Sequence, residues 1–181
     1  MNMDNYRQAF TLIMDQKEED FIALTTSTDF DVSWKDSNGN SLLTQSIRYG
    51  LTKVFDHLIK LNVDVDNYNG YGTTSLMWAI KEREYEMFAQ IIEKNPDLSL
   101  KNREGDTAGT FILSYSNKKI IEQFILSLRD RRSLSLLESH ISHTNHPFKI
   151  FCIGVIGIAN LQLNLNNSLL DKPIKENKRK L

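Results

Sequence analysis

The stretch KDSNGNSLLTQSIRYG, residues 35–50, begins with turn-forming residues and runs directly into an amphipathic helical pattern. A similar stretch, NGYGTTSLMWAIKE, follows at 69–82, and a fainter one, REGDTAGTFILSYS, at 103–116. Their glycines, Gly39, Gly72 and Gly105, are separated by 33 residues each time. A fixed period of this length indicates supersecondary units that stack because none of them can bury its apolar face alone.

Each of these glycines is followed two residues later by a hydroxyl side chain, where a helix N-cap would lie. The three hydroxyl residues are Ser41, Thr74 and Thr107. The glycine itself supplies the positive φ that such a turn needs. After each cap come about ten residues of helical pattern, and a second helix follows with apolar residues at three- and four-residue steps. The repeated unit is therefore a turn, a helix, a loop and a second helix.

Other segments recur with the same period. The helix starts read GNSLLTQS, GTTSLMWA and GDTAGTFI, and the second helices carry LI at 58–59, II at 91–92 and FI at 124–125. The loops NVDVD at 62–66 and NPDLS at 95–99 follow the first two units. In these segments the chain, over roughly residues 5–130, resembles the ankyrin-repeat family, whose signature is G-x-TPLH-x-A. The resemblance implies an all-α repeat solenoid, an ankyrin-like stack of helix–turn–helix units with short hairpin loops.

The units depart from that signature. None has its proline or histidine, and Gly109 stands where leucine is expected. The hydrogen bonds that the family's histidine makes between repeats are therefore expected to be missing or replaced.

We expect the chain to divide along the repeat period. The expected segments are a divergent N-terminal capping repeat at 1–34, ankyrin-like repeats at 35–67, 68–101 and 102–130, a C-terminal cap or degenerate helix pair at 131–170, and a basic disordered tail at 171–181. Within the C-terminal part, NLQLNLN at 160–166 alternates apolar and polar residues, which indicates either a strand or an irregular end.

The composition excludes several classes of protein. The net charge of −1 gives no global field that favours nucleic acid, so we predict no nucleic-acid partner. The single cysteine, Cys152, rules out an internal disulfide and fits a reducing compartment, so we predict a cytoplasmic location, or the host-cell cytosol for a secreted effector. The longest apolar run, 150–159, has ten residues. A spanning helix needs roughly 20, so we predict no membrane span.

The C-terminal region suggests an alternative function, a metal-binding or enzymatic site around His140, His143 and His146. Residues three apart share a helix face, as ligands of one ion would need to. The spacing is unlike the paired spacing of zinc sites, so we favour a polar inter-helix stretch. Cys152 lies among apolar residues, which indicates a buried structural thiol. An interfacial membrane helix at 148–161 is a third option, disfavoured because this segment lacks a basic polar face.

The resemblance implies that a partner is contacted by the hairpin tips and the exposed ends of the first helices. Tyrosine and arginine are enriched at the centres of protein interfaces. The tyrosines and basic residues at the implied positions are Arg48, Tyr49, Tyr71, Lys81, Arg103 and Tyr115. We predict that these six residues form the partner-contact patch. Trp78 falls mid-helix where the family places a buried residue, and we expect it in the core.

No phosphate loop, dinucleotide fingerprint, paired-histidine metalloprotease motif or nucleophile elbow occurs in the sequence. We therefore predict a non-enzymatic protein–protein interaction module. It would act as a monomeric scaffold, either an adaptor or an inhibitor, or as a host-directed effector of a microbe or virus. Its partner is expected to be another protein, and no cofactor or metal is expected.

Overall fold

The computed structural model describes residues 3–27, 30–143 and 147–170. These residues form ten helices and two isolated β-bridges, and no β-strand occurs among them. The helices are α1 Met3–Met14, α2 Glu18–Ser27, α3 Leu42–Arg48, α4 Thr52–Lys60, α5 Ser75–Glu82, α6 Tyr85–Glu93, α7 Ala108–Tyr115, α8 Lys118–Ser127, α9 Arg131–Ser142 and α10 Lys149–Leu170. The predicted all-α class is confirmed. The chain divides into two compact units, Met1–Ile121 and Glu122–Leu181.

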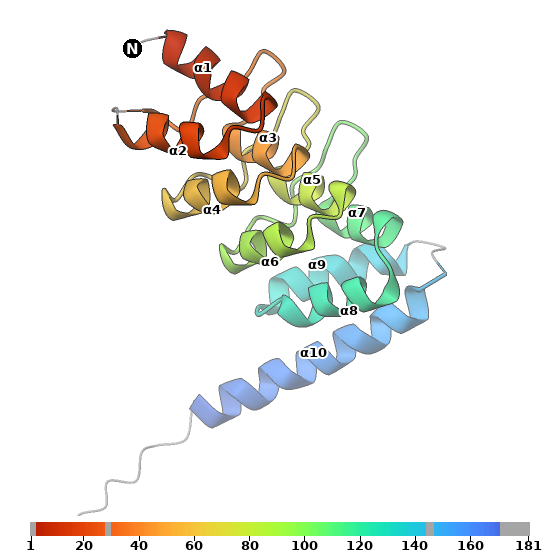
Figure 1. Cartoon of the computed structure of the whole chain (residues 1–181). Coiled ribbons are helices and arrows are strands. Elements are labelled where there is room, and N and C mark those ends of the chain that lie inside the picture. The colour runs from red at the N-terminus through yellow and green to blue at the C-terminus, as the bar shows by residue number, and fades with distance from the viewer. Residues whose placement is uncertain (1–2, 28–29, 144–146, 171–181) are drawn as a thin grey trace, which may run out of the picture. The chain divides into compact units, whose positions relative to one another are not determined.

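In the first unit, pairs of antiparallel helices stack in chain order (Figure 1). The first helices α1, α3, α5 and α7 form one row in which each contacts the next, and α2 and α4 contact each other in a second row. The apolar residues of the second helices are buried at the predicted positions, Val54, Phe55, Leu58 and Ile59 in α4 and Met87, Phe88, Ile91 and Ile92 in α6. The core therefore lies between the two rows and between successive pairs.

The three predicted N-caps begin the first helices. The hydroxyl oxygens of Ser41, Thr74 and Thr107 accept hydrogen bonds from the backbone N–H three residues further on. The N···O distances are 3.1, 3.3 and 3.4 Å. Each cap satisfies one of the backbone donors that a helix N-terminus leaves unpaired, so the prediction of capping is confirmed.

Two of the repeated glycines are required by the approach of the next hairpin. Gly39 and Gly72 have φ values of +78° and +76°. A Cβ atom on Gly39 would lie 2.9 Å from the backbone nitrogen of Gly70, and one on Gly72 would lie 3.0 Å from the Cα atom of Asn102. Successive hairpins therefore stack at a separation that leaves no room for a side chain.

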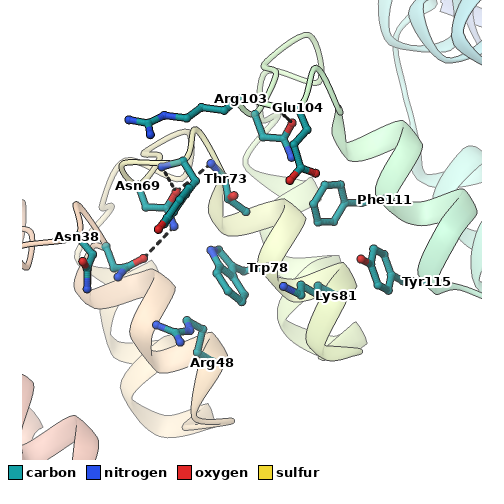
Figure 2. Close-up of a pocket in the computed structure, with 13 residues that line it drawn as sticks. Asn38, Arg48, Asn69, Thr73, Trp78, Lys81, Arg103, Glu104, Phe111 and Tyr115 are labelled. Carbon is teal, nitrogen blue, oxygen red and sulfur yellow. Dashed lines mark hydrogen bonds between the residues drawn. The ribbon is translucent and has the colours of Figure 1, made fainter.

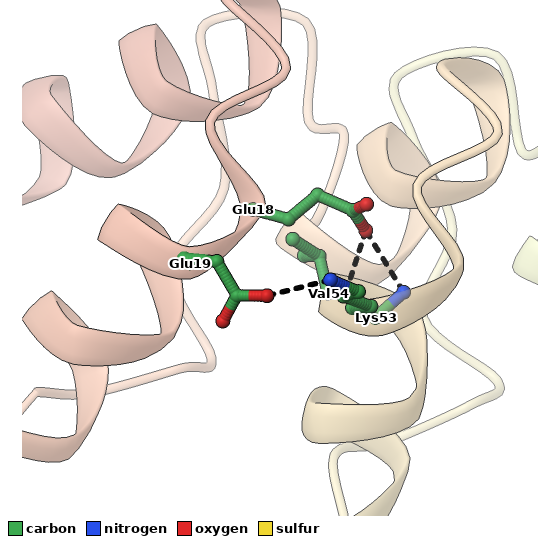
Figure 3. Close-up of polar contacts among 4 residues, drawn as sticks. All are labelled: Glu18, Glu19, Lys53 and Val54. Atoms are coloured by element: carbon green, nitrogen blue, oxygen red, sulfur yellow. Dashed lines mark hydrogen bonds and ion pairs between the residues drawn. The ribbon is translucent and has the colours of Figure 1, made fainter.

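The second helix α4 is capped by a residue of the preceding pair. Its own N-cap residue, Leu51, makes no side-chain hydrogen bond to the helix. Instead, Oε2 of Glu18 accepts from the backbone N–H groups of Lys53 and Val54, at 2.8 and 3.2 Å (Figure 3). Glu19 also forms an ion pair with the Lys53 side chain at 2.6 Å. The N-terminal helix pair is thus joined to the next repeat through the start of α4.

A histidine of α4 makes a second polar link to the N-terminal pair. Nε2 of His57 lies 2.9 Å from Oγ1 of Thr25 in α2. The Thr25 hydroxyl also donates to the carbonyl of Phe21, so it accepts from His57 in the tautomer that carries a proton on Nε2. Burial lowers the pKa of His57, and the nearby charge of Lys60 lowers it further.

A pair of hydroxyl groups replaces one of the expected inter-repeat hydrogen bonds. Thr44 stands at the signature histidine position of the first full repeat. Its Oγ1 atom lies 3.2 Å from Oγ of Ser75 in the next repeat, and both side chains are buried. We expected the inter-repeat hydrogen bonds of the signature histidine to be missing or replaced. Between these two repeats, a hydrogen bond between two hydroxyl groups replaces one of them.

The second unit contains α9 packed against α10. One stripe of α10 is buried, Cys152, Val155, Ile156 and Ala159, while Ile150, Ile158, Leu161 and Leu165 are exposed. The prediction of a strand or irregular end at 160–166 is wrong, because these residues continue the helix. Leu161 and Leu165 would share one side of a strand, but in the helix they lie about one turn apart on the same face.

We predicted no membrane span because the longest apolar run is short, but the length of α10 removes this reason. The apolar run at 150–159 lies within a helix of 22 residues, whose window Lys149–Asn166 has a mean hydropathy of 1.2 with 22% of the window buried. By length and composition this helix could cross a membrane. Length and composition alone do not place it in one, and the absence of a span stays a prediction. The predicted basic tail, 171–181, lies outside the described residues.

Candidate partner-binding groove

Each hairpin tip is shaped by one Asp or Asn side chain that recurs every 33 residues. Oδ1 of Asp36 accepts from the backbone N–H groups two and four residues further on, both at 2.9 Å. Asn69 makes the same two bonds at 2.9 and 3.1 Å, and Asn102 makes them at 2.9 and 2.8 Å. The side chain thereby gives a hydrogen-bond acceptor to two backbone N–H groups of the turn. The three tips consequently have one shape.

The tips are joined to one another by hydrogen bonds. The N–H of Gly70 donates to the carbonyl of Asn38 at 2.8 Å, and the N–H of Arg103 donates to the carbonyl of Tyr71 at 2.9 Å. Between the first two tips, Nδ2 of the buried Asn69 also donates to Oδ1 of Asn40 at 3.1 Å. The hairpins and the first helices therefore form one continuous surface.

A groove of about 530 Å³ runs across this surface within the first unit (Figure 2). It is lined by side chains from three successive repeats: Asn38, Asn40, Arg48, Asn69, Tyr71, Thr73, Trp78, Lys81, Asn102, Arg103, Glu104, Phe111 and Tyr115. Its floor comes from α3, α5 and α7, and its rim from the hairpin tips. The lining combines aromatic rings with amide and charged groups, which is the composition of protein interfaces rather than of a core.

The groove brings together five of the six residues predicted from the sequence to contact a partner. These are Arg48, Tyr71, Lys81, Arg103 and Tyr115. Tyr49 is the exception. It forms the C-cap of α3 with 39% of its surface exposed and is not part of the groove lining.

Trp78 lies in the groove, and the prediction that it belongs to the core is wrong. It is half-buried, whereas its neighbour Ala79 is fully buried. The guanidinium carbon of Arg48 lies 4.8 Å from the ring centroid, and Nζ of Lys81 lies 4.7 Å from it. Figure 2 shows the ring between these two side chains. Both cations are within the range of attraction to the face of an indole ring.

The sequence carries a signal for the position of Trp78. Its equivalents one period away are Gln45 and Phe111. A register that holds glutamine, tryptophan and phenylalanine carries larger side chains than the register of Ser46, Ala79 and Ile112, which is fully buried.

The groove has an excess of positive charge. Arg48, Lys81 and Arg103 line it together with one carboxylate, Glu104. The ion pairs of Lys17 with Asp15 and of Lys53 with Glu19 include no groove residue. The cations are held by rings and amides instead, since Arg103 lies 5.6 Å from the ring of Tyr71 and Arg48 donates to Gln45. Their charge therefore stays available to a partner.

One carboxylate beneath the rim of the groove has a perturbed pKa. Burial alone would raise the pKa of Asp36, but hydrogen bonds from Asn40, Asn38 and Gln45 outweigh it and lower the pKa below its usual range. Because each donor stabilises the ionised form, Asp36 is a charged structural residue at neutral pH. Its carboxylate accepts hydrogen bonds from Asn38, Asn40 and Gln45.

The alternative metal site is not supported by the described residues. His140 and His143 lie at the end of α9, while His146 lies outside the described residues. Nδ1 of His143 lies 2.6 Å from the carbonyl of Ser139 in the same helix. Across 3–27, 30–143 and 147–170, no group of three His, Cys, Asp or Glu residues could hold a metal ion. Burial raises the pKa of the Cys152 thiol, as expected for an unreactive structural residue.

Comparison with known proteins agrees with the repeat geometry. The family model for ankyrin repeats, in three copies, matches residues 9–102, which is more than half of the chain. A protein of Acanthamoeba polyphaga mimivirus that is named for its ankyrin repeats is 24% identical over 125 residues. The matched part is 64% of this chain and only 16% of that relative. With its capped first helices, its stacked hairpins and this match, the chain belongs to the ankyrin-repeat family.

Proposed function

We propose that the protein is a non-enzymatic module that binds a segment of another protein in the groove around Trp78. Ankyrin repeats are generally protein-binding modules. The observation that carries the proposal is the groove itself, which collects aromatic and charged side chains from three repeats in one open depression. Large aromatic side chains and arginine supply most of the binding energy in protein interfaces. We assign partner contact to Arg48, Tyr71, Trp78, Lys81, Arg103 and Tyr115.

Further roles follow from this proposal. We infer a monomeric scaffold that acts as an adaptor or an inhibitor, because its assigned chemistry is recognition alone. The single, buried cysteine fits a reducing compartment, so we place the protein in the cytoplasm. If a microbe or virus delivers it as an effector, that compartment is the host-cell cytosol.

The proposal is tested by capture of partners with two double variants matched in residue type. The groove variant is Tyr71→Ala with Tyr115→Ala, at residues 65% and 42% exposed. The control variant is Tyr49→Ala with Tyr68→Ala, at residues 39% and 57% exposed that do not line the groove. Each full-length protein is immobilised, incubated with lysate of the cells in which it is made, and washed before mass spectrometry.

We expect a protein that is retained by the wild type and the control variant and is lost from the groove variant. Circular dichroism melting checks that both variants are folded. Retention by the groove variant together with loss from the control variant would place the contact elsewhere and contradict the proposal.

A further inference from the structure

We propose that the segment bound in the groove is acidic, with aspartate or glutamate side chains that pair with Arg48, Lys81 and Arg103. This inference rests on the proposed function, because it names the chemistry of the partner at the same groove. Its starting point is that three cations and one carboxylate line the groove, although the whole chain has a net charge of −1. The positive charge is therefore a local property of this surface.

The positions of two cations define a spacing for the partner. Arg48 and Lys81 occupy the same register of successive repeats, on α3 and α5. Their charged groups lie 4.8 and 4.7 Å from the centroid of the same ring, so they can be no farther apart than these two distances together. In a polyproline-type extended chain, residues three apart lie on one face at a separation of about 9 Å. That separation falls within the upper limit set by the shared ring, so an extended segment with two acidic residues separated by two others can reach both cations.

A hydrogen-bond donor in the groove lacks an acceptor. Nε1 of Trp78 is buried and has no hydrogen-bond partner within the described residues. A buried donor without an acceptor is unfavourable, and native proteins rarely keep one without a functional reason. We infer that a carboxylate or a peptide carbonyl of the bound segment supplies the missing acceptor. Carboxylates offer acceptors alone, which matches a groove rich in donors.

The same observations favour a peptide over a nucleic acid. Binding to nucleic acid depends on many phosphate contacts, commonly about six to ten for a specific DNA-binding protein. The groove offers three cations and places Glu104 beside one of them. A short acidic peptide needs only a few ion pairs and can use the aromatic rings and the side-chain amides of Asn38 and Asn102 for the rest of its length.

The test begins with selection of random 12-residue peptides by display against the immobilised full-length protein. We expect the selected peptides to be enriched in aspartate and glutamate, most strongly at positions three apart. The best peptide is then synthesised with a fluorescent label, and its dissociation constant is measured by anisotropy. Because exposed charge pairs are screened by salt, we expect the affinity to fall as the salt concentration rises from 50 to 300 mM.

Two triple variants with equal charge change separate a specific effect from a general one. The groove variant is Arg48→Gln, Lys81→Gln and Arg103→Gln. The control variant is Lys60→Gln, Lys94→Gln and Lys119→Gln, at exposed residues outside the groove. We expect the groove variant to bind the peptide at least about tenfold more weakly, which corresponds to ~1.4 kcal/mol. We expect the control variant to bind within about twofold of the wild type.

The outcomes distinguish this inference from the proposed function. Selected peptides without acidic enrichment that still need Tyr71 and Tyr115 would overturn the acidic partner and leave the binding module in place. Peptides that bind equally to every groove variant, or no selected peptide at all, would count against both. Equal weakening in the two triple variants, or equal competition by a 12-nucleotide oligothymidylate, would show a response to charge in general and overturn the acidic-peptide assignment.

Discussion

Replacing Gly39 with alanine tests whether the hairpins stack as tightly as the groove requires. Gly105→Ala is the matched control, because both glycines have positive φ, +78° and +87°. The shared backbone strain costs an L-residue about 1–2 kcal/mol, partly offset by ~0.4–1 kcal/mol from a less flexible unfolded chain. The two positions differ in their surroundings. A Cβ atom on Gly39 would lie 2.9 Å from the nitrogen of Gly70, whereas one on Gly105 would meet nothing within 4 Å.

The added methyl group on Gly39 must push the next hairpin away. That movement weakens the hydrogen bond from Gly70 to the carbonyl of Asn38, now 2.8 Å long. Overpacking costs roughly 1–3 kcal/mol, and a lost hydrogen bond about 0.5–1.5 kcal/mol. We therefore expect Gly39→Ala to lower the free energy of unfolding by about 2.5–5.5 kcal/mol and Gly105→Ala by about 1 kcal/mol.

Urea unfolding followed by circular dichroism at 222 nm measures both changes. The midpoints of the two variants are compared with that of the wild type at a common slope. If Gly105→Ala costs as much as Gly39→Ala, the close approach of the first two hairpins is not what requires glycine, and the stacking described here is wrong.

Three other perturbations probe the contacts between repeats. Glu18→Ala removes the acceptor of two N–H groups at the start of α4 and should cost about 0.5–2 kcal/mol in urea unfolding, whereas Glu19→Ala removes only an exposed ion pair and should cost less. Thr44→Val leaves the buried hydroxyl of Ser75 without this partner and should cost about 1–3 kcal/mol, and an unchanged midpoint would refute the bridge. Burial keeps the pKa of His57 below its ordinary value of 6.5, so the unfolded chain binds the proton more readily. Stability should be full above about pH 6.5 and decline as the pH falls towards the folded pKa, and a His57→Gln variant should show a smaller decline between pH 7.5 and 5.5.

The turns and helix starts were predictable because their residue types are imposed locally. A positive φ requires glycine at Gly39 and Gly72, and an N-cap requires a short acceptor such as Ser41 or Thr74, whatever the tertiary contacts are. Asp36, Asn69 and Asn102, whose side chains hold the hairpin tips, also recur every 33 residues, but we did not identify them from the sequence. Their role appears only when each side chain is seen to accept from two backbone amides.

The groove residues were harder to predict because one step along a helix turns a side chain by about 100°. Trp78 and Ala79 are adjacent in sequence, yet one lies in the groove and the other in the core. Tyr49 follows the last residue of α3, so the helical periodicity no longer determines which way its side chain points. In α10, the alternation around Leu161 and Leu165 resembled a strand over seven residues, but the preceding helix continues through it.

Hydrogen–deuterium exchange of the full-length chain, with and without the partner recovered on the wild type, tests the central claim most directly. A segment bound in the groove should slow exchange of backbone amides at the hairpin tips 36–40, 69–73 and 102–106. Exchange in α10, which exposes Ile150, Ile158 and Leu161, should not change. Protection in α10 with unchanged hairpin tips would contradict the claim that the groove around Trp78 is the binding site.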